Sequence, residues 1–521
     1  MKVPLTPLRC LERAADLFGR KTGVVCGEKR FTYTEMADRC GRLASSLERH
    51  GVQPGDRVAF LSYNTHKLLE GYYGVPQARA IVMPLNVRLT PVELAAIMQH
   101  AEPEFFFFEP EFTDTVNHLR NALPGLRAIN LDTEYEDFLA AGDRVRPDIF
   151  SYEEDSIAEL FYTSGSTGTP KGVMLSHRTV YMHAIGCVGS MNLNPNGVEL
   201  HTIPLFHANG WGRPQTSAMM GMKQVMVRRF DPACVCRLIE DERATAMSVV
   251  PTMATALLAF DGRAAFDLSS LEQIYIGGAA SSPAITESLE KAFRCEVLAG
   301  YGMTETCPVA TSSRRKSTVV YTSDEDRWQH HAVAGWPVFG AEVRVVDAAM
   351  ADVPRNLCAV GEVVVRGDIV MDGYFREPDA TAAVMTGAWL HTGDMAVWDE
   401  ENYIHIVDRK KDIIISGGEN ISSIEVERAI AAHPCVFENA VVAAPDDHWG
   451  EVPVAFVVTK PGVTLDHAEL RAYLVERLAK FKVPHQYVIR AEPLPKGGTG
   501  KILKRELRET FWQGHEKRVK G

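Results

Sequence analysis

Residues 162–173 read Tyr-Thr-Ser-Gly-Ser-Thr-Gly-Thr-Pro-Lys-Gly-Val, and the pattern around this stretch decides the fold. The apolar run 157–162 that leads into it predicts a buried strand. Glycine lets a backbone approach a ligand closely, and hydroxyls with successive N–H groups can form a concave anion site. Lys171 adds a mobile positive charge. A loop that holds the phosphates of a nucleotide is therefore favoured over a polar linker, although the spacing is not that of a Walker A loop.

Short apolar segments alternate with amphipathic ones on both sides of this loop, which is typical of parallel α/β sheets. Helices are predicted between these segments, several of them opened by Ser, Thr or Pro. A fold of class α/β follows: a large N-terminal domain of stacked parallel sheets with a β subdomain, then a small, mobile C-terminal α+β domain. The strands are predicted at 58–61, 80–85, 105–108, 202–205, 247–250, 273–276 and 296–298, and short β strands follow from residue 334. The domain boundaries are expected at 1–408, 409–412 (hinge) and 413–521.

Composition narrows the functional class. The 521 residues carry a formal charge of −12, which gives no reason to expect nucleic acid binding. Ten scattered cysteines without a repeated spacing suggest reduced thiols and a cytoplasmic protein. We expect no signal peptide, no membrane-spanning helix and no peroxisomal address at the C-terminus.

Two further predicted strands end in glycine-containing loops. Gly277-Gly278-Ala279-Ala280 follows one, and Gly300-Tyr301-Gly302-Met303-Thr304-Glu305 follows the next. In parallel sheets, ligands bind beyond the carboxyl ends of the strands. Each loop has a simpler interpretation, a strand-to-helix turn for the first and a helix-opening acid for Glu305.

Five segments in this order resemble the adenylate-forming superfamily, which comprises acyl-CoA synthetases, adenylation domains and firefly-type luciferases. The other three segments are 163–172, His391-Thr392-Gly393-Asp394 with Arg409, and 495–501. The resemblance covers essentially the whole chain. It implies that a carboxylic acid and ATP give an acyl adenylate and pyrophosphate, after which a thiol gives a thioester and AMP.

The resemblance also implies roles for individual residues. Lys501 would stabilise charge at the α-phosphorus, Thr304 would contact the α-phosphate, and Glu305 would bind Mg²⁺. Asp394 and Arg409 would hold the ribose. Residues implied at ATP or AMP are Thr163, Ser164, Gly165, Ser166, Thr167, Gly168, Thr169, Lys171, Gly278, Ala279, Ala280, Gly300, Tyr301, Gly302, Met303, Thr304, Asp394 and Arg409.

Other positions match the second half-reaction and the acyl site. Lys411 matches a hinge about which the small domain would rotate, removing Lys501 and bringing in a pantetheine tunnel. That tunnel is expected at Ser416, Gly417, Gly418 and Glu419. The acyl pocket is expected at His207, Asn209, Gly210, Trp211 and Val309. Trp211 would shorten it and Gly210 would open it, so apolar short to medium acids, branched and aromatic acids included, are expected.

The favoured interpretation is a ligase that uses ATP, Mg²⁺ and coenzyme A and whose partners are small molecules. The oligomeric state, a homodimer included, is left open. An adenylation enzyme that loads a carrier-protein thiol is the alternative. A luciferase-like oxygenase is remote. A non-enzymatic binding protein would not need Lys501 and Glu305 together.

Overall fold

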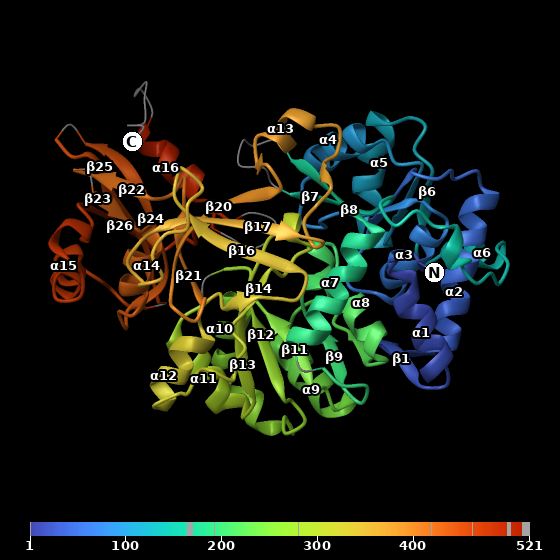
Figure 1. The fold of residues 1–521 in the computed structure, drawn as a ribbon, viewed down its shortest axis with the longest axis horizontal. Helices are drawn as coiled ribbons and strands as arrows, with labels where there is room; N and C mark the ends of the chain where they lie inside the picture. Colours follow the sequence, from blue (N-terminus) through green and yellow to red (C-terminus); the bar gives the residue numbers. More distant parts are fainter. Residues whose placement is uncertain are drawn as a thin grey trace. The chain divides into compact units, whose positions relative to one another are not determined.

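The computed structural model describes residues 2–163, 170–191, 193–279, 281–417, 419–446, 448–460, 462–496 and 502–512, without the side chains of Asn209 and Asn420. The chain forms two compact units, whose elements are labelled in Figure 1. The first comprises Met1–Val343 and Val364–His391, and the second comprises Arg344–Val363 and Thr392–Gly521. The hinge predicted at 409–412 falls within the second unit and stays a prediction about motion.

One sheet of the first unit has seven strands in the order β18-β8-β7-β4-β3-β5-β6. The strands β3 to β7 pair in parallel, whereas β7, β8 and β18 pair antiparallel. The segment at 164–170 therefore joins the two strands of a hairpin, in which Thr163 lies opposite Lys171. The bounds are β3 Arg57–Leu61, β4 Ile81–Pro84, β5 Phe105–Phe108, β6 Ala128–Asn130, β7 Ile157–Thr163, β8 Lys171–Ser176 and β18 Gly373–Tyr374.

The other large sheet of this unit has nine strands in the order β15-β14-β13-β12-β11-β9-β10-β1-β2. Its centre, from β1 to β13, is parallel, so the carboxyl ends of β9, β11, β12 and β13 share one edge. The bounds are β1 Thr22–Cys26, β2 Lys29–Thr32, β9 Val198–His201, β10 Lys223–Met226, β11 Ala246–Val249, β12 Gln273–Ile276, β13 Glu296–Tyr301, β14 Thr311–Ser312 and β15 Trp336–Pro337.

Helices join the two large sheets into one body. Residues of α2, α3, α7 and α8 share one apolar cluster with strands of both sheets, and Figure 1 shows α7 beside α8. Thr90 and Ser176 cap α4 and α7, as predicted. The helices are α1 Leu8–Phe18, α2 Tyr33–Arg49, α3 His66–Gln77, α4 Pro91–Ala101, α5 Thr113–Ala122, α6 Tyr135–Ala140, α7 His177–Ser190, α8 Ala208–Met220, α9 Pro232–Glu242, α10 Pro251–Ala259, α11 Pro283–Phe293, α12 Asp324–His331 and α13 Pro378–Ala382.

The second unit contains a five-stranded sheet in the order β23-β22-β25-β24, with β26 paired with β25. A further sheet, β16-β17-β20-β19 with β21 on β20, includes the strands in which the chain passes from one unit to the other. The bounds are β16 Ala341–Val346, β17 Gly361–Gly367, β19 Met385–Thr386, β20 Trp389–Trp398, β21 Ile404–Arg409, β22 Ile414–Ser416, β23 Glu419–Ile421, β24 Val436–Asp446, β25 Gly450–Thr459 and β26 Gln486–Arg490, with α14 Ser423–Ala431, α15 His467–Val475 and α16 Lys504–Trp512.

The predicted fold class is confirmed, and two element boundaries are corrected. The strand predicted at 202–205 lies at Val198–His201, because Pro204 cannot donate to a sheet ladder. The apolar face of Leu470, Tyr473, Leu474 and Leu478 predicts a helix from Asp466 to Lys480, but the helix ends at Val475 and a turn follows at 476–478. Within the described ranges, every helix is too short or too polar to cross a bilayer.

Candidate active site

The two glycine loops lie side by side at the carboxyl edge of the nine-stranded sheet. They follow β12 and β13, which pair in parallel with Ile276 opposite Ala299. A β-carbon at Gly277 would lie 3.1 Å from the Gly300 carbonyl oxygen, and one at Gly302 would lie 1.8 Å from that of Pro308. Gly278 has a φ of +75°, in the left-handed region. The Gly277 contact is tight packing between the two loops, whereas the Gly302 contact lies within the second loop and leaves no room for a side chain.

Next to these loops, a carboxylate and a lysine contact the same tyrosine side chain. Glu305 is buried, and its Oε1 accepts a 2.9 Å hydrogen bond from the Tyr374 hydroxyl. The Nζ of Lys171 lies 4.8 Å from the centroid of the same tyrosine ring. Thr304, adjacent to Glu305, is buried as well. The structure thus brings together three residues that the sequence assigned to phosphate and metal binding.

The remaining residues of the β13 loop are held by hydrogen bonds within the loop itself. The Met303 amide donates to the Thr306 hydroxyl (3.0 Å), and the Tyr301 carbonyl accepts from the Ala310 amide (2.9 Å). Ala279, at the end of the other loop, is exposed. An internally hydrogen-bonded β13 loop and an exposed end of the β12 loop suit a bound planar ligand.

The first residues of α8 adopt an uncommon backbone conformation. Ala208, Gly210, Trp211 and Gly212 all have positive φ, and the φ of Trp211 is +61°. Such a conformation is costly for a bulky residue and is frequent at functional sites. The Trp211 ring lies over the first glycine loop, 3.2 Å from the positions of β-carbons at Gly277 and Gly278. The predicted acyl wall therefore contacts the predicted nucleotide loop.

His183 of α7 joins the two sides of the predicted acyl pocket, and sequence reasoning missed it. Its Nε2 accepts a 3.1 Å hydrogen bond from the Val309 amide. On the other side, a β-carbon at Gly212 would lie 2.3 Å from the His183 ring. Burial lowers the pKa of His183 to about 3, so the ring is neutral and can accept this bond. A lone histidine in an apolar helix gives no signal that could have identified it. The backbone of His207 also turns here, with its carbonyl accepting from the Gly210 amide.

In the second unit, the structure pairs Asp394 with Arg409. The two residues lie opposite each other in β20 and β21, with 3.6 Å between Asp394 Oδ1 and Arg409 Nε. The Asp394 amide donates to the Thr392 hydroxyl at 3.1 Å. The carboxylate can accept hydrogen bonds from vicinal hydroxyls, and the guanidinium can donate hydrogen bonds to the same hydroxyls.

The loop predicted to bind pantetheine packs against an aromatic residue, Trp449, that the sequence analysis did not identify. The Gly417 amide donates to the Trp449 carbonyl (2.8 Å), and a β-carbon at Gly417 would lie 2.7 Å from the Trp449 ring. Ser416 pairs with Glu419 in the β22–β23 ladder. Trp449 is 47% exposed. A large exposed aromatic side chain often marks a binding surface.

Several predicted residues lie outside the described part of the chain. They are Ser164, Gly165, Ser166, Thr167, Gly168, Thr169, Ala280, Gly418 and Lys501, together with the side chain of Asn209. Lys411 is described, and its carbonyl accepts a 3.2 Å hydrogen bond from Arg508 of α16.

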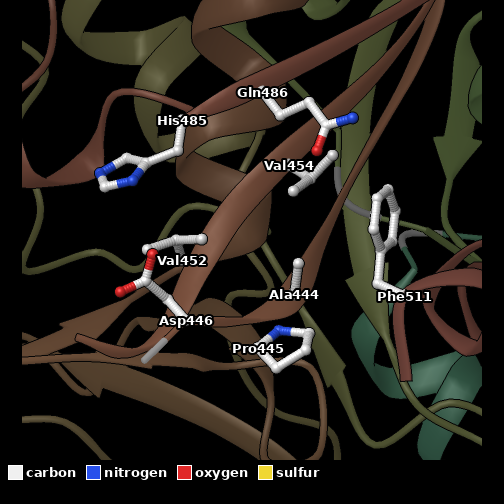
Figure 2. Close-up of a pocket in the computed structure, with 8 residues that line it drawn as sticks. All are labelled: Ala444, Pro445, Asp446, Val452, Val454, His485, Gln486 and Phe511. Carbon is white, nitrogen blue, oxygen red and sulfur yellow. The ribbon is translucent and has the colours of Figure 1, made fainter. Parts of the chain in front are cut away.

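A separate cavity of about 390 Å³ lies in the second unit, and Figure 2 shows its lining. Ala444, Val452 and Val454 form an apolar floor, while Asp446 and His485 lie at one side and Phe511 at the other. None of the predicted site residues lines it.

The chain is similar to known proteins along its whole length. Residues 11–375 match the family described as AMP-binding enzyme, and residues 425–501 match the AMP-binding enzyme C-terminal domain. A long-chain-fatty-acid–CoA ligase of Thermus thermophilus is 38% identical, covering 96% of this chain and 94% of its own. The 4-hydroxybutyrate–CoA ligase 2 of Metallosphaera sedula is 34% identical, covering 97% and 94%.

Solved structures agree with this similarity. ATP-bound MatB from Rhodopseudomonas palustris superposes with a TM-score of 0.86 at 28% identity, covering 99% of this chain and 100% of that chain. The anthranilate CoA ligase AuaEII in complex with anthranoyl-AMP gives a TM-score of 0.88 at 25% identity, covering 98% of each chain.

Proposed function

Because the chain belongs to the AMP-binding enzyme family, we propose that it is an AMP-forming acid–CoA ligase that works through an acyl adenylate. The observation that carries this proposal is the meeting of Lys171 and Glu305 at Tyr374, beside the glycine loops of β12 and β13. Full-length relatives named as CoA ligases support CoA, and not a carrier-protein thiol, as the acceptor.

The chemistry needs positioned charge more than a protein nucleophile. In the first step a carboxylate oxygen of the acid attacks the α-phosphorus of ATP, and the bond to pyrophosphate breaks. In the second step the CoA thiolate attacks the acyl carbonyl, and AMP leaves. Both leaving groups are stable anions, so the protein contributes mainly alignment and charge neutralisation.

Each predicted residue then has a task in the first step. Lys171 and the hairpin loop hold the β- and γ-phosphates, and Thr304 contacts the α-phosphate. Lys501 stabilises the charge that develops at the α-phosphorus. Asp394 and Arg409 bind the ribose hydroxyls, a role supported by their pairing across β20 and β21.

The donor set at Glu305 fits Mg²⁺. Magnesium commonly takes one or two carboxylates with phosphate oxygens and waters, and Glu305 presents a buried carboxylate that bonds to Tyr374, whose ring also contacts Lys171. Among the described residues no group of three or more His, Cys, Asp or Glu could hold a metal alone, so phosphate oxygens would complete the shell. Bound Mg²⁺ would neutralise phosphate charge.

The acyl pocket is proposed to take apolar acids of short to medium length, branched and aromatic acids included. Its support is the Trp211 ring, which lies over Gly277 and Gly278 and would limit the depth available. The proposal includes a cytoplasmic location, supported by ten free thiols among the described residues. The oligomeric state, a homodimer included, is left open.

Pyrophosphate release over a panel of carboxylic acids tests the first step. The panel should run from acetate to long-chain acids and include benzoate and a branched acid. Product analysis with CoA, with a carrier protein bearing phosphopantetheine, and with neither then tests the acceptor. We expect acid-dependent pyrophosphate release and a thioester with CoA alone. Release without any thioester to CoA would contradict the proposal.

A further inference from the structure

Tyr374 contacts the two charged groups that the proposed reaction needs near the phosphates. Its hydroxyl donates to Glu305 Oε1 at 2.9 Å, and its ring lies 4.8 Å from Lys171 Nζ. Nothing in the sequence motifs pointed to this residue, which lies about 70 positions after Glu305 in the short strand β18.

The position of Tyr374 is fixed from several sides. It pairs with Val173 in the ladder between β18 and β8, two residues after Lys171. Its amide donates to the Thr381 hydroxyl at 2.8 Å, and the side chain is 7% exposed. The amide of Met371, in the turn before β18, donates to the Glu305 carbonyl at 2.9 Å. Ring and hydroxyl therefore have little freedom relative to both partners.

The chemistry of this hydroxyl differs from that of most buried tyrosines in the first unit. Tyr72, Tyr73 and Tyr152 all donate to backbone carbonyl oxygens, which is the ordinary way to satisfy a buried hydroxyl. Tyr374 donates to a carboxylate of the candidate site.

We propose that Tyr374 is a positioning residue for the Mg²⁺–ATP complex. Its hydroxyl holds one oxygen of Glu305, which fixes the orientation of the carboxylate towards the metal. Its ring holds the Lys171 ammonium by a cation–π contact, which sets the spacing between metal ligand and phosphate-binding lysine. This inference rests on the proposed function for the identity of the nucleotide.

Two substitutions separate the contacts. Tyr374→Phe removes the hydrogen bond and keeps the ring, whereas Tyr374→Leu removes both. Tyr152→Phe is the matched control, because Tyr152 is buried to a similar degree (8% exposed) and its hydroxyl bonds to the Gln77 carbonyl, away from the site.

The measurement is ATP affinity by calorimetry, with Mg²⁺ and with EDTA, in the absence of acid and CoA. We expect Tyr374→Phe to weaken binding by about 10-fold in Mg²⁺ and by less than about 2-fold in EDTA, as for a lost hydrogen bond to a charged group. Tyr374→Leu should weaken binding in both conditions. The Tyr152→Phe protein should match wild type in both.

A double-mutant cycle gives a second test. In a Glu305→Gln background, adding Tyr374→Phe should cause no further loss of ATP affinity in the presence of Mg²⁺, because the carboxylate and the hydroxyl act as a unit. Equal losses with Mg²⁺ and EDTA, no loss, a fully additive cycle or a Tyr374→Phe protein that does not fold would each overturn the proposal. Failure of wild type to release pyrophosphate with any acid would instead contradict the proposed function, since the binding experiments need no turnover.

Discussion

At Gly302 a β-carbon would lie 1.8 Å from the Pro308 carbonyl oxygen, so glycine alone fits this position. The same reasoning holds for Gly278, where a positive φ coincides with the Trp211 ring. At the scale of the residue, glycine in this site marks close approach of one backbone to another or to a ring. Those positions could be anticipated, because glycines clustered after predicted strands are a local signal.

Trp211 gives the first prediction at this scale. Removing its ring in Trp211→Gly should open the space above Gly277 and Gly278 and relieve a left-handed backbone. We compare kcat/KM for an acid that is a few methylenes longer with kcat/KM for the acid that the wild type uses best. This ratio should rise at least 10-fold in Trp211→Gly, since each methylene is worth about 1–3 kcal/mol. Steady-state kinetics over a homologous series measures this ratio. An unchanged profile would exclude Trp211 as a wall of the pocket.

His66 is the first residue of helix α3 and follows the capping residue Thr65. Its ring stacks on Phe31 at 4.9 Å, and neither ring nitrogen has a hydrogen-bond partner among the residues that the structure describes. Burial, with nearby cations, lowers the pKa of His66 to about 3. Protonation at a helix N-terminus is unfavourable as well.

A pH prediction follows from His66. Between pH 6.5 and pH 3, the unfolded chain binds a proton at His66 and the folded chain does not. The contribution of the neutral His66 to the free energy of unfolding is therefore present at neutral pH and is lost as the pH falls towards 3. In His66→Phe, the free energy of unfolding should fall less between pH 7.5 and pH 5, by about 2 kcal/mol. Urea unfolding at the two pH values measures this difference. A substitution at the exposed His118 should keep the wild-type dependence, and a wild-type dependence in His66→Phe would refute the assignment.

At the scale of the element, strand register places chemistry that motifs only suggest. The β20–β21 ladder sets Asp394 opposite Arg409, although 14 residues separate them in the chain. We expect Asp394→Asn to weaken AMP binding by about 10–100-fold, as for hydrogen bonds to a charged group. The control is Asp352→Asn, which disrupts the Arg344–Asp352 pair (2.6 Å) of the same unit. Calorimetry with AMP measures both, and equal affinities would contradict the ribose role.

Elements differ in how well the sequence predicted them. Buried strands such as β5, with four phenylalanines, and helices with a Thr or Ser cap were located correctly, because their signals are local. The strand at 198–201 was misplaced because Pro204 cannot donate to a sheet ladder, and β8 was missed although it forms a hairpin with β7, because its apolar run is only Val173 to Leu175. The contacts of His183 with Val309, Tyr374 with Glu305 and Trp449 with Gly417 could not be predicted, because each joins residues far apart in the chain. Motifs identify residue types, whereas long-range packing selects the side chains that orient them.

At the scale of the whole molecule, the residues proposed for the chemistry are divided between the two compact units. The β7–β8 hairpin and Glu305 belong to the first unit, while Asp394, Gly417 and the segment leading to Lys501 belong to the second. Three chain passages join the units. A reaction in two steps can then use different parts of the second unit in turn, which is the physical reason for expecting rotation about Lys411.

The two half-reactions can be separated by substitution. Lys501→Ala should lower adenylation, measured as acid-dependent pyrophosphate release, by about 10²–10³-fold, because one positioned charge is lost. Thioester formation from a supplied acyl adenylate and CoA should be spared. Gly417→Val should give the reverse pattern, since its φ of +59° and the adjacent Trp449 ring leave no room for a side chain in the pantetheine loop. Lys496→Ala, which removes a neighbouring lysine paired with Glu438, should leave both steps intact. If Lys501→Ala abolished both steps, one arrangement of the units would have to serve both, and rotation about Lys411 would lose its basis.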